Sequence, residues 1–478
     1  MPGVVVTTAV RTGPNGANIA PSSTFFVCGT AQRGPTDAAK LITSVSDFEE
    51  VYGTYSASYT LHQHVRTFFE EGGTRCYVSR VVGASATAGS LSLGSSDMTL
   101  TAANVGSWSS NLSATVTTVN ANFVIKVFYD GTLVYTTGEV ATVQAATNKI
   151  NNSTVAVNYI TATANNASVV LGTAAEASFS AGANGDAVTE GQYLAGLDLF
   201  EAPLGAGAVA IPGLFSQNYY ESLIDHAVAN NRIAILGMDP SITTTAGATA
   251  EASSYGSYEG AEYAAFYYPR VKVPINGVST VISPESYVAA KRAIAHQQIG
   301  PWQAGAGVLS VAKYVTGLEV AVDKAAGDEL DDGRVNALRV IQGAVRIYGA
   351  RSASNDEENY RYITYRDTIN YIVVEAERSL EDLVFSVIDG RRTVFSRVEA
   401  RLIGLLDPIR QKGGLYEAFD ADGKQLDAGY TVEVTDALNP VTQLASGLIR
   451  AKVGVRVSSV GDRIEVEIIK SNLTSSVV

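Results

Sequence analysis

Hydrophobic and polar positions in the first part of the chain follow two periods, one typical of strands and one of helices. Over residues 23–82, apolar runs of strand length are separated by segments with apolar residues at helical spacing. The expected elements are strands at 24–30 and 75–82, a capped helix at 46–53 closed by Gly53, and a helix with Leu61, Val65 and Phe68 on one side, ended by Gly72 and Gly73. This succession indicates a mixed α/β domain.

The pattern changes at Gly83. Residues 84–189 are rich in Ala, Thr, Ser, Asn and Val and carry few charges. Apolar residues alternate over 123–129 and again over 133–135, and Asp130-Gly131 between them favours a two-residue hairpin turn. Because α/β patterning resumes afterwards, we interpret 84–189 as an inserted β-rich domain.

The mixed pattern returns from Gly191 to about Ala344. Its expected elements are buried strands at 209–213 and 233–236, a helix near 219–230, a loop of small and polar residues at 243–257 and a short helix at 286–295.

An α+β pattern occupies the last part of the chain. The expected elements are strands at 346–350 and 360–363, helices at 368–382 and 392–411, and a terminal hairpin. In this hairpin the apolar residues Val453, Val455 and Val457 occupy alternate positions before a turn at 459–462, and Ile464, Val466 and Ile468 alternate after it. Pro408 should kink the second helix or end it early, because proline lacks the amide hydrogen.

The first residues of the chain look like an extended arm. The run 4–10 is strand-prone, and Gly13, Pro14, Gly16 and Pro21 then break any helix. This strand has no partner close in sequence, so its main-chain hydrogen bonds must be made elsewhere. The expected organisation is an arm at 1–24, a mixed α/β domain at 25–83 plus 190–344, the insertion at 84–189 and an α+β domain with a terminal strand arm at 345–478. The fold class is therefore multidomain α+β.

Charge and composition narrow the function. The net charge of −13 argues against a nucleic-acid partner, which requires a basic surface. We find neither a long apolar run that would span a membrane nor a secretory signal, so membrane insertion is not expected and folding in the cytoplasm is. Cys28 and Cys76 lie in strand-like runs and are expected to be buried thiols rather than a disulfide.

Catalytic patterns are weak, and we expect no catalytic, cofactor-binding or metal-binding residues. The run 205–210 matches a dinucleotide-binding motif but leads into a strand rather than a helix. His62 and His64 are two apart on a helix and point to different sides. The acidic run 328–332 lacks calcium-loop spacing, and 420–423 is better explained as a turn.

Several short motifs resemble those of the contractile tail sheath family, and they occur in the family's order across most of the chain. The similar segments are 2–6 at the start, 29–35 (GTAxRGP), 48–53, 68–78 (FFxNGG followed by YV), 264–269 (AAxYYP), 300–304, 335–339 with 346–351, and 360–366. One departure is 384–390, where many members have VFEPND.

The resemblance implies a structural subunit of a virion tail, assembled in the bacterial cytoplasm, that forms stacked hexameric rings around a tail tube and contracts to drive the tube through the host envelope for genome delivery. Its expected partners are copies of itself, the tube protein, and baseplate and tail terminator proteins. It also implies exchange of terminal strands between subunits, for which the residues here are Val4, Val5, Val6, Ile464, Val466 and Ile468. A donated strand would add to a sheet edge in a neighbour.

A second hypothesis concerns charge. Arg392, Arg397, Arg401 and Arg410 cluster on one expected helix of an otherwise acidic chain. We expect this basic helix either to face an acidic tube surface or to be an ordinary solvated face. Alternatives for the whole chain are the sheath of a headless tailocin or of a contractile secretion or injection system and, in another class, a monomeric β-rich binding protein built around 84–189.

Overall fold

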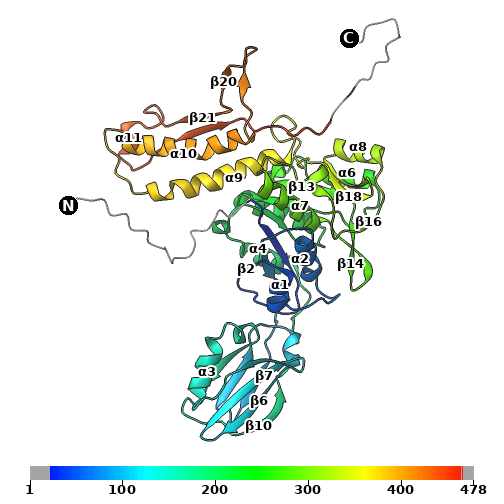
Figure 1. The fold of residues 1–478 in the computed structure, drawn as a ribbon, viewed down its shortest axis with the longest axis vertical. Helices are drawn as coiled ribbons and strands as arrows, with labels where there is room; N and C mark the ends of the chain where they lie inside the picture. The colour runs from blue at the N-terminus through cyan, green and yellow to red at the C-terminus, as the bar shows by residue number, and fades with distance from the viewer. Residues whose placement is uncertain (1–21, 464–465, 467–478) are drawn as a thin grey trace, which may run out of the picture.

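The computed structural model describes residues 22–463 and Val466. Figure 1 shows a central body, a separate lobe below it and a pair of long helices that projects from the top of the body. The N-terminal strand predicted around Val4, Val5 and Val6, and the C-terminal residues Ile464 and Ile468, lie outside the described residues.

The body is built on an eight-stranded sheet in the order β18-β17-β13-β12-β11-β1-β3-β2. Its six inner strands are parallel, and the two edge strands run antiparallel to their neighbours. The strands are β1 (Phe25–Gly29), β2 (Lys40–Ile42), β3 (Cys76–Arg80), β11 (Ala208–Ala210), β12 (Ile233–Leu236), β13 (Ala264–Tyr268), β17 (Val335–Ile341) and β18 (Ala344–Tyr348). A three-stranded sheet, β14 (Val271–Ile275), β15 (Val278–Ile282) and β16 (Gly317–Leu318), lies beside it.

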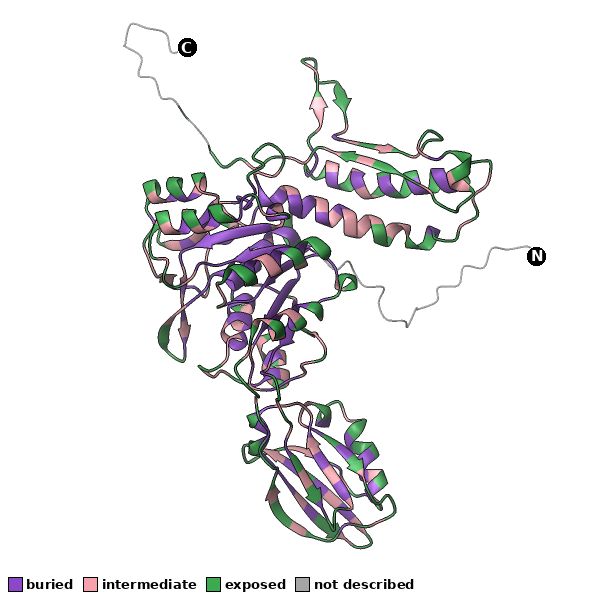
Figure 2. Ribbon diagram, turned by 180° about the vertical axis from the view of Figure 1, so that it is seen from behind, coloured by how far each residue is buried: buried purple, intermediate pink, exposed green. Residues whose placement is uncertain are grey.

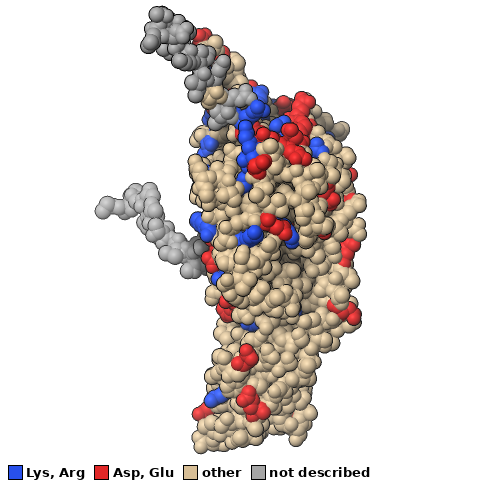
Figure 3. Space-filling view, turned by 90° about the vertical axis from the view of Figure 1, so that its right-hand side faces the viewer, with Lys and Arg blue, Asp and Glu red and all other residues tan. Residues whose placement is uncertain are grey.

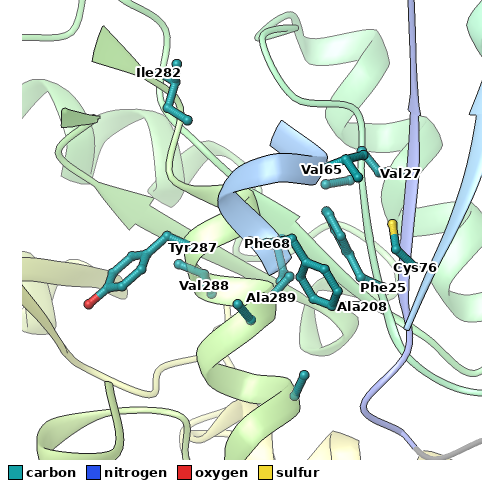
Figure 4. Packing of buried hydrophobic residues seen from close by; sticks show 14 of the residues in the cluster. Phe25, Val27, Val65, Phe68, Cys76, Ala208, Ile282, Tyr287, Val288 and Ala289 are labelled. Atoms are coloured by element: carbon teal, nitrogen blue, oxygen red, sulfur yellow. The ribbon is translucent and has the colours of Figure 1, made fainter. Parts of the chain in front are cut away.

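Helices cover both faces of the large sheet, which explains why its inner strands are apolar throughout. One face packs against α1 (Val45–Tyr52), α2 (Leu61–Glu70) and α7 (Glu285–Gln298). The other packs against α4 (Glu190–Asp198), α5 (Gln217–Ala229), α6 (Thr245–Ser254) and α8 (Lys324–Asp332). In β1, Phe25 belongs to the first core and Phe26 to the second. Figure 4 shows Phe68 of α2 against Phe25, whose ring centroid is 5.1 Å away.

The capped helix predicted at 46–53 is confirmed as α1. The Ser44 hydroxyl accepts from the Asp47 N–H at its start, and Gly53 ends it at a φ of 87° that disfavours residues with a Cβ. The loop predicted at 243–257 is wrong, because most of it is α6. Only Ala248 and Ala252 of α6 are buried, and such small side chains give little hydrophobic periodicity to detect.

The lobe contains a four-stranded sheet, a three-stranded sheet and one helix. Its elements are β4 (Ser90–Leu93), β5 (Met98–Ala102), β6 (Leu112–Val119), β7 (Asn122–Tyr129), β8 (Thr132–Thr136), α3 (Val143–Asn151), β9 (Ile160–Ala164) and β10 (Ala174–Ser178). The predicted hairpin is present: Tyr129 pairs with Thr132, and both turn residues have positive φ. The buried cluster of the lobe contains only residues between Leu93 and Phe179. Figure 2 shows buried segments within the lobe itself, so the lobe has its own core.

Two arginines of the body fasten the lobe. Arg33 donates to the Asn158 carbonyl and lies 4.5 Å from the ring centroid of Tyr159. The buried Arg80 donates to the Val105 carbonyl at 3.0 Å as well as to body carbonyls. In the view of Figure 3 the lobe, at the bottom, carries few charged side chains. These contacts tie a charge-poor lobe to a defined place on the body.

The projecting helices are α9 (Ile363–Leu380) and α10 (Thr393–Gln411), followed by β19 (Ala418–Phe419), β20 (Gln425–Asp427), β21 (Tyr430–Glu433), α11 (Val441–Leu444) and β22 (Lys452–Val455). We call 363–463 the C-terminal module. The strand predicted at 360–363 is wrong: Tyr362 makes one isolated bridge to Arg351, and α9 begins at Ile363. Pro408 does not end α10, which continues to Gln411. The first half of the predicted terminal hairpin pairs with β21 instead.

Candidate assembly surfaces

A buried charge cluster joins the start of the described chain to the C-terminal module. The Arg292 guanidinium of α7 makes a two-pronged contact with the Asp367 carboxylate in the first turns of α9. A further Arg292 N–H donates to the Ser22 carbonyl at 2.5 Å, and His296 Nδ1 lies 2.9 Å from the Ser22 hydroxyl. Arg292 and His296 hold the pKa of Asp367 below its usual range against the opposing effect of burial. The cluster therefore fixes where the N-terminal segment leaves the body relative to α9.

The C-terminal module carries a two-stranded sheet with one apolar face. Side chains of β21 and β22 pack on α9 and α10, in two clusters that include Ile372, Leu402, Leu406 and Ile409. The strand residues on this face are Tyr430, Val432, Val434, Val453 and Val455. The opposite face, with Thr431, Glu433, Lys452 and Arg456, is exposed. A sheet of two strands is thus held in place by the helices beneath it.

Both edges of this sheet present main-chain N–H and C=O groups that could pair with a further strand. The Arg456 N–H donates to the Gly429 carbonyl, and Tyr430 pairs with Val455 in the next register position. Since main-chain groups of successive residues point to opposite sides of a strand, those of Val432 point outward from β21 and those of Val453 outward from β22. Within 22–463 no backbone partner contacts either edge along these strands. Exposed strand edges are templates for pairing with another strand.

The four arginines predicted to form a basic helix all lie on or at the start of α10, but three of them have acidic partners in the chain. Arg392 pairs with Asp436, Arg401 with Asp382 at 2.7 Å, and Arg410 with Glu417 at 2.5 Å. Arg397 is exposed and has no ion pair within the described residues. Asp436 and Asp382, 44 and 19 residues away, could be placed beside their arginines only by the fold, whereas Arg410 also pairs with Asp407 three residues earlier on α10. Much of the basic charge is therefore compensated.

Of the predicted strand-exchange residues only Val466 is described, and its side chain is 76% exposed. The other five lie outside the described residues. Sequence reasoning named candidate donor strands but did not identify the two-stranded sheet of the C-terminal module. The alternation of 430–434 and 453–455 was a signal for this sheet, yet the second run was assigned to a hairpin with 464–468.

The residues considered for catalysis take part in the packing and hydrogen bonding of the fold. Gly207 contacts the Thr24 carbonyl so closely that a Cβ there would overlap it, which accounts for a glycine before β11. His62 Nε2 lies 2.8 Å from the Glu49 carboxylate, whereas His64 faces the Ser286 hydroxyl on α7. At the carboxyl end of β1, where doubly wound sheets often bind ligands, the Thr30 carbonyl accepts from the Leu61 N–H of α2. The first turn of α2 therefore lies directly at the end of β1.

Cys28 and Cys76 are buried free thiols, as predicted. Within the described part of the chain, no three His, Cys, Asp or Glu side chains gather in a way that would hold a metal ion. None of the helices in the described ranges has the length and apolar character needed to cross a bilayer.

Comparison by sequence alone finds no relative: no protein-family model matches the chain, and no curated protein matches it. Comparison by structure does. The sheath of the anti-feeding prophage, in its contracted state, is 15% identical and superposes over 98% of this chain and 99% of that chain, with a TM-score of 0.59. The contracted sheath complex of an extracellular contractile injection system, PVC, is 17% identical over 98% of each chain, with a TM-score of 0.56.

A crystal structure of a sheath tail protein from Listeria innocua gives a TM-score of 0.63 at 14% identity, covering 87% of this chain and 89% of that one. Identities this low establish the fold rather than the activity. The likeness extends over nearly the whole chain and so includes the body, the lobe and the C-terminal module. The protein has the multidomain α+β fold of contractile sheath subunits, which are structural proteins.

Proposed function

We propose that the chain is the subunit of a contractile sheath that polymerises as stacked hexameric rings around a tail tube and contracts to drive the tube through a cell envelope. The observation that carries the proposal is the fold likeness to sheath proteins over 98% of the chain. The chain also presents a helix-supported sheet with two open edges, which is what a strand-linked polymer needs.

The strands donated to these edges are the N-terminal run with Val4, Val5 and Val6 and the C-terminal run with Ile464, Val466 and Ile468. A strand of three or four residues adds a few main-chain hydrogen bonds, each contributing about 0.5–1.5 kcal/mol. Its alternate apolar side chains would continue the face formed by Val432 and Val453 over α10. Because donor and acceptor are different surfaces, the contact is head-to-tail and generates rings or helical filaments.

Negative-stain electron microscopy tests this function. The intact chain is expected to form rings or tubes, alone or with its cognate tube, and a chain lacking residues 1–20 is not. An Arg11→Ala variant, altered in the arm but not in the strand, is the matched control and should assemble. Dispersed monomers from the intact chain even with the tube present would contradict the sheath function and favour a monomeric binding protein.

The surface that faces the tube is a second part of the proposal. Of the predicted set Arg392, Arg397, Arg401 and Arg410, only Arg397 lacks an acidic partner among residues 22–463, and Lys412 at the end of α10 is likewise exposed. We expect Arg397→Glu with Lys412→Glu to weaken binding to an acidic tube, mainly at low salt. Arg401→Glu disturbs an existing ion pair and serves as the comparison. Equal tube binding by all variants would contradict the electrostatic contact.

The finer assignment is to the tail of a phage virion that delivers a genome, assembled with baseplate and terminator proteins. A headless tailocin or injection system is the second candidate, favoured by the near-complete mutual coverage with the anti-feeding prophage and PVC sheaths. Particles isolated with this sheath decide between them. DNA-filled heads support the virion, and headless particles that carry no genome support the second candidate.

A further inference from the structure

The free end of the C-terminal module exposes large apolar side chains. The loop between α9 and α10 holds Val384, Phe385 and Val387, whose exposed fractions are 55%, 100% and 82%. Phe385 has a φ of 65°, a conformation disfavoured for residues with a Cβ. Arg391 in the same loop is exposed and has no ion pair in the described ranges. We call these four residues the tip.

The tip is a defined structure rather than a loose loop. The Asp389 carboxylate accepts from the Thr393 N–H and hydroxyl, which closes the loop onto the start of α10. Arg392 pairs with Asp436 and so joins the loop to the segment before α11. An ordered loop that presents a fully exposed phenylalanine at positive φ is better explained by a contact than by solvent.

The opposite end of α10 carries a second exposed apolar surface. The β19–β20 hairpin projects from the module (Figure 1) and exposes Phe419 and Leu426, at 54% and 66%. Asp420 orders its turn by accepting from the Asp422 and Lys424 N–H groups. Asp422 stands exposed beyond this turn. Between Glu417, which pairs with Arg410, and Asp427, which pairs with Arg456, the turn carries Asp420 and Asp422 against one lysine. The turn of this hairpin is therefore acidic, whereas the tip carries Arg391, unpaired within the described ranges.

The two surfaces lie at the two ends of one rigid element. α10 has 19 residues and is therefore about 28 Å long, too long for the tip to reach the hairpin of the same chain. We propose that the tip of one subunit docks on the β19–β20 hairpin of a second copy of this chain, with Phe385 and Val387 against Phe419 and Leu426 and Arg391 beside Asp422. The docking is head-to-tail, so it repeats from subunit to subunit.

This inference rests on the proposed sheath function but uses side-chain surfaces rather than donated strands. It gives the modules a contact that fixes the spacing of neighbours along α10, whereas a donated strand fixes only their connection. The opposite charges select tip against hairpin and disfavour tip against tip. A tube subunit is the competing occupant of the tip.

Disulfide trapping tests the contact in the full chain. Phe385→Cys combined with Leu426→Cys should give, on oxidation, a ladder of covalent dimers, trimers and longer species. Phe385→Cys alone should give none, and the two single variants mixed should give dimers only. The natural thiols Cys28 and Cys76 are buried and do not interfere. Val278→Cys combined with Leu426→Cys is the matched control, because Val278 is 65% exposed on the body and should give no ladder.

Charge exchange provides a second readout. Arg391→Asp in the double-cysteine chain should slow ladder formation by about tenfold, and adding Asp422→Arg should restore it. Tubes without a ladder, or cross-links from position 385 to the tube protein alone, would overturn the docking and leave the sheath function standing. A ladder without tubes would support the docking and contradict the sheath. The absence of both the ladder and the tubes would contradict the docking and the sheath function together.

Discussion

At the scale of single residues, His64 links stability to pH. Its ring is buried, faces Ser286, and burial lowers its pKa from 6.5 to about 3. The unfolded chain therefore takes up this proton first on acidification, so the contribution is complete above pH 6.5 and decreases as the pH falls toward 3. At pH 5 the free energy of unfolding should be about 2 kcal/mol lower than at pH 7 through this group alone.

Urea titrations at the two pH values measure this loss. His64→Asn should reduce the loss by about the same 2 kcal/mol, whereas Gln63→Ala, on the same helix, should leave it unchanged. An identical pH dependence in wild type and His64→Asn would show that the buried ring does not take up a proton on unfolding.

A second residue-scale prediction concerns Glu71, whose carboxylate pairs with a buried lysine and also accepts hydrogen bonds from a loop. Its buried carboxylate lies 2.5 Å from the Lys291 ammonium and accepts from the N–H groups of Lys313, Tyr314 and Val315. Glu71→Gln leaves the lysine buried without its counter-charge and should reduce the free energy of unfolding by about 3–5 kcal/mol. Glu70→Gln breaks only the exposed pair with Arg66 and should change it by less than about 0.5 kcal/mol. Similar urea midpoints for the two variants would contradict this.

At the scale of elements, the charge cluster at Asp367 couples three segments that are distant in sequence. Asp367→Asn removes the counter-charge of Arg292, which also donates to Ser22. We therefore expect faster amide hydrogen exchange in the first turns of α9 and at the start of β1 together. Asp382→Asn, in an exposed pair with Arg401, should change neither segment. Faster exchange in α9 alone would show that the cluster does not hold the root of the N-terminal segment.

The elements also show what the sequence could predict. Local chemistry specified α1 through Ser44 and Gly53, and the β7–β8 hairpin through Asp130 and Gly131. It failed for α6, whose buried face is two alanines, and for the start of α9, where aromatic residues suggested a strand. The pairing of β22 with β21 and the acidic partners of Arg392 and Arg401 depend on contacts across 19 to 44 residues. Patterns among neighbouring residues do not indicate which distant segments come into contact.

At the scale of the whole molecule, the lobe should be separable from assembly. Its buried cluster is self-contained, and its two connections to the body run side by side, since the Gly83 N–H donates to the Asn184 carbonyl. Joining Gly83 directly to Asp186 removes residues 84–185 without spanning a gap. The body loses the lobe contacts of Arg33 and Arg80, but Arg80 keeps the Ala31 and Gly34 carbonyls as acceptors.

We therefore expect the shortened chain to fold, with a modestly lower thermal midpoint, and to polymerise like the intact chain. The lobe lies at the far end of the body from the C-terminal module, which carries the strand edges proposed to link subunits (Figure 1). If the module lines the tube, the lobe decorates the outside. Electron microscopy should then show sheaths with the same inner diameter and a smaller outer diameter. A folded variant that fails to assemble would place the lobe between subunits, and an unchanged outer diameter would place it away from the exterior.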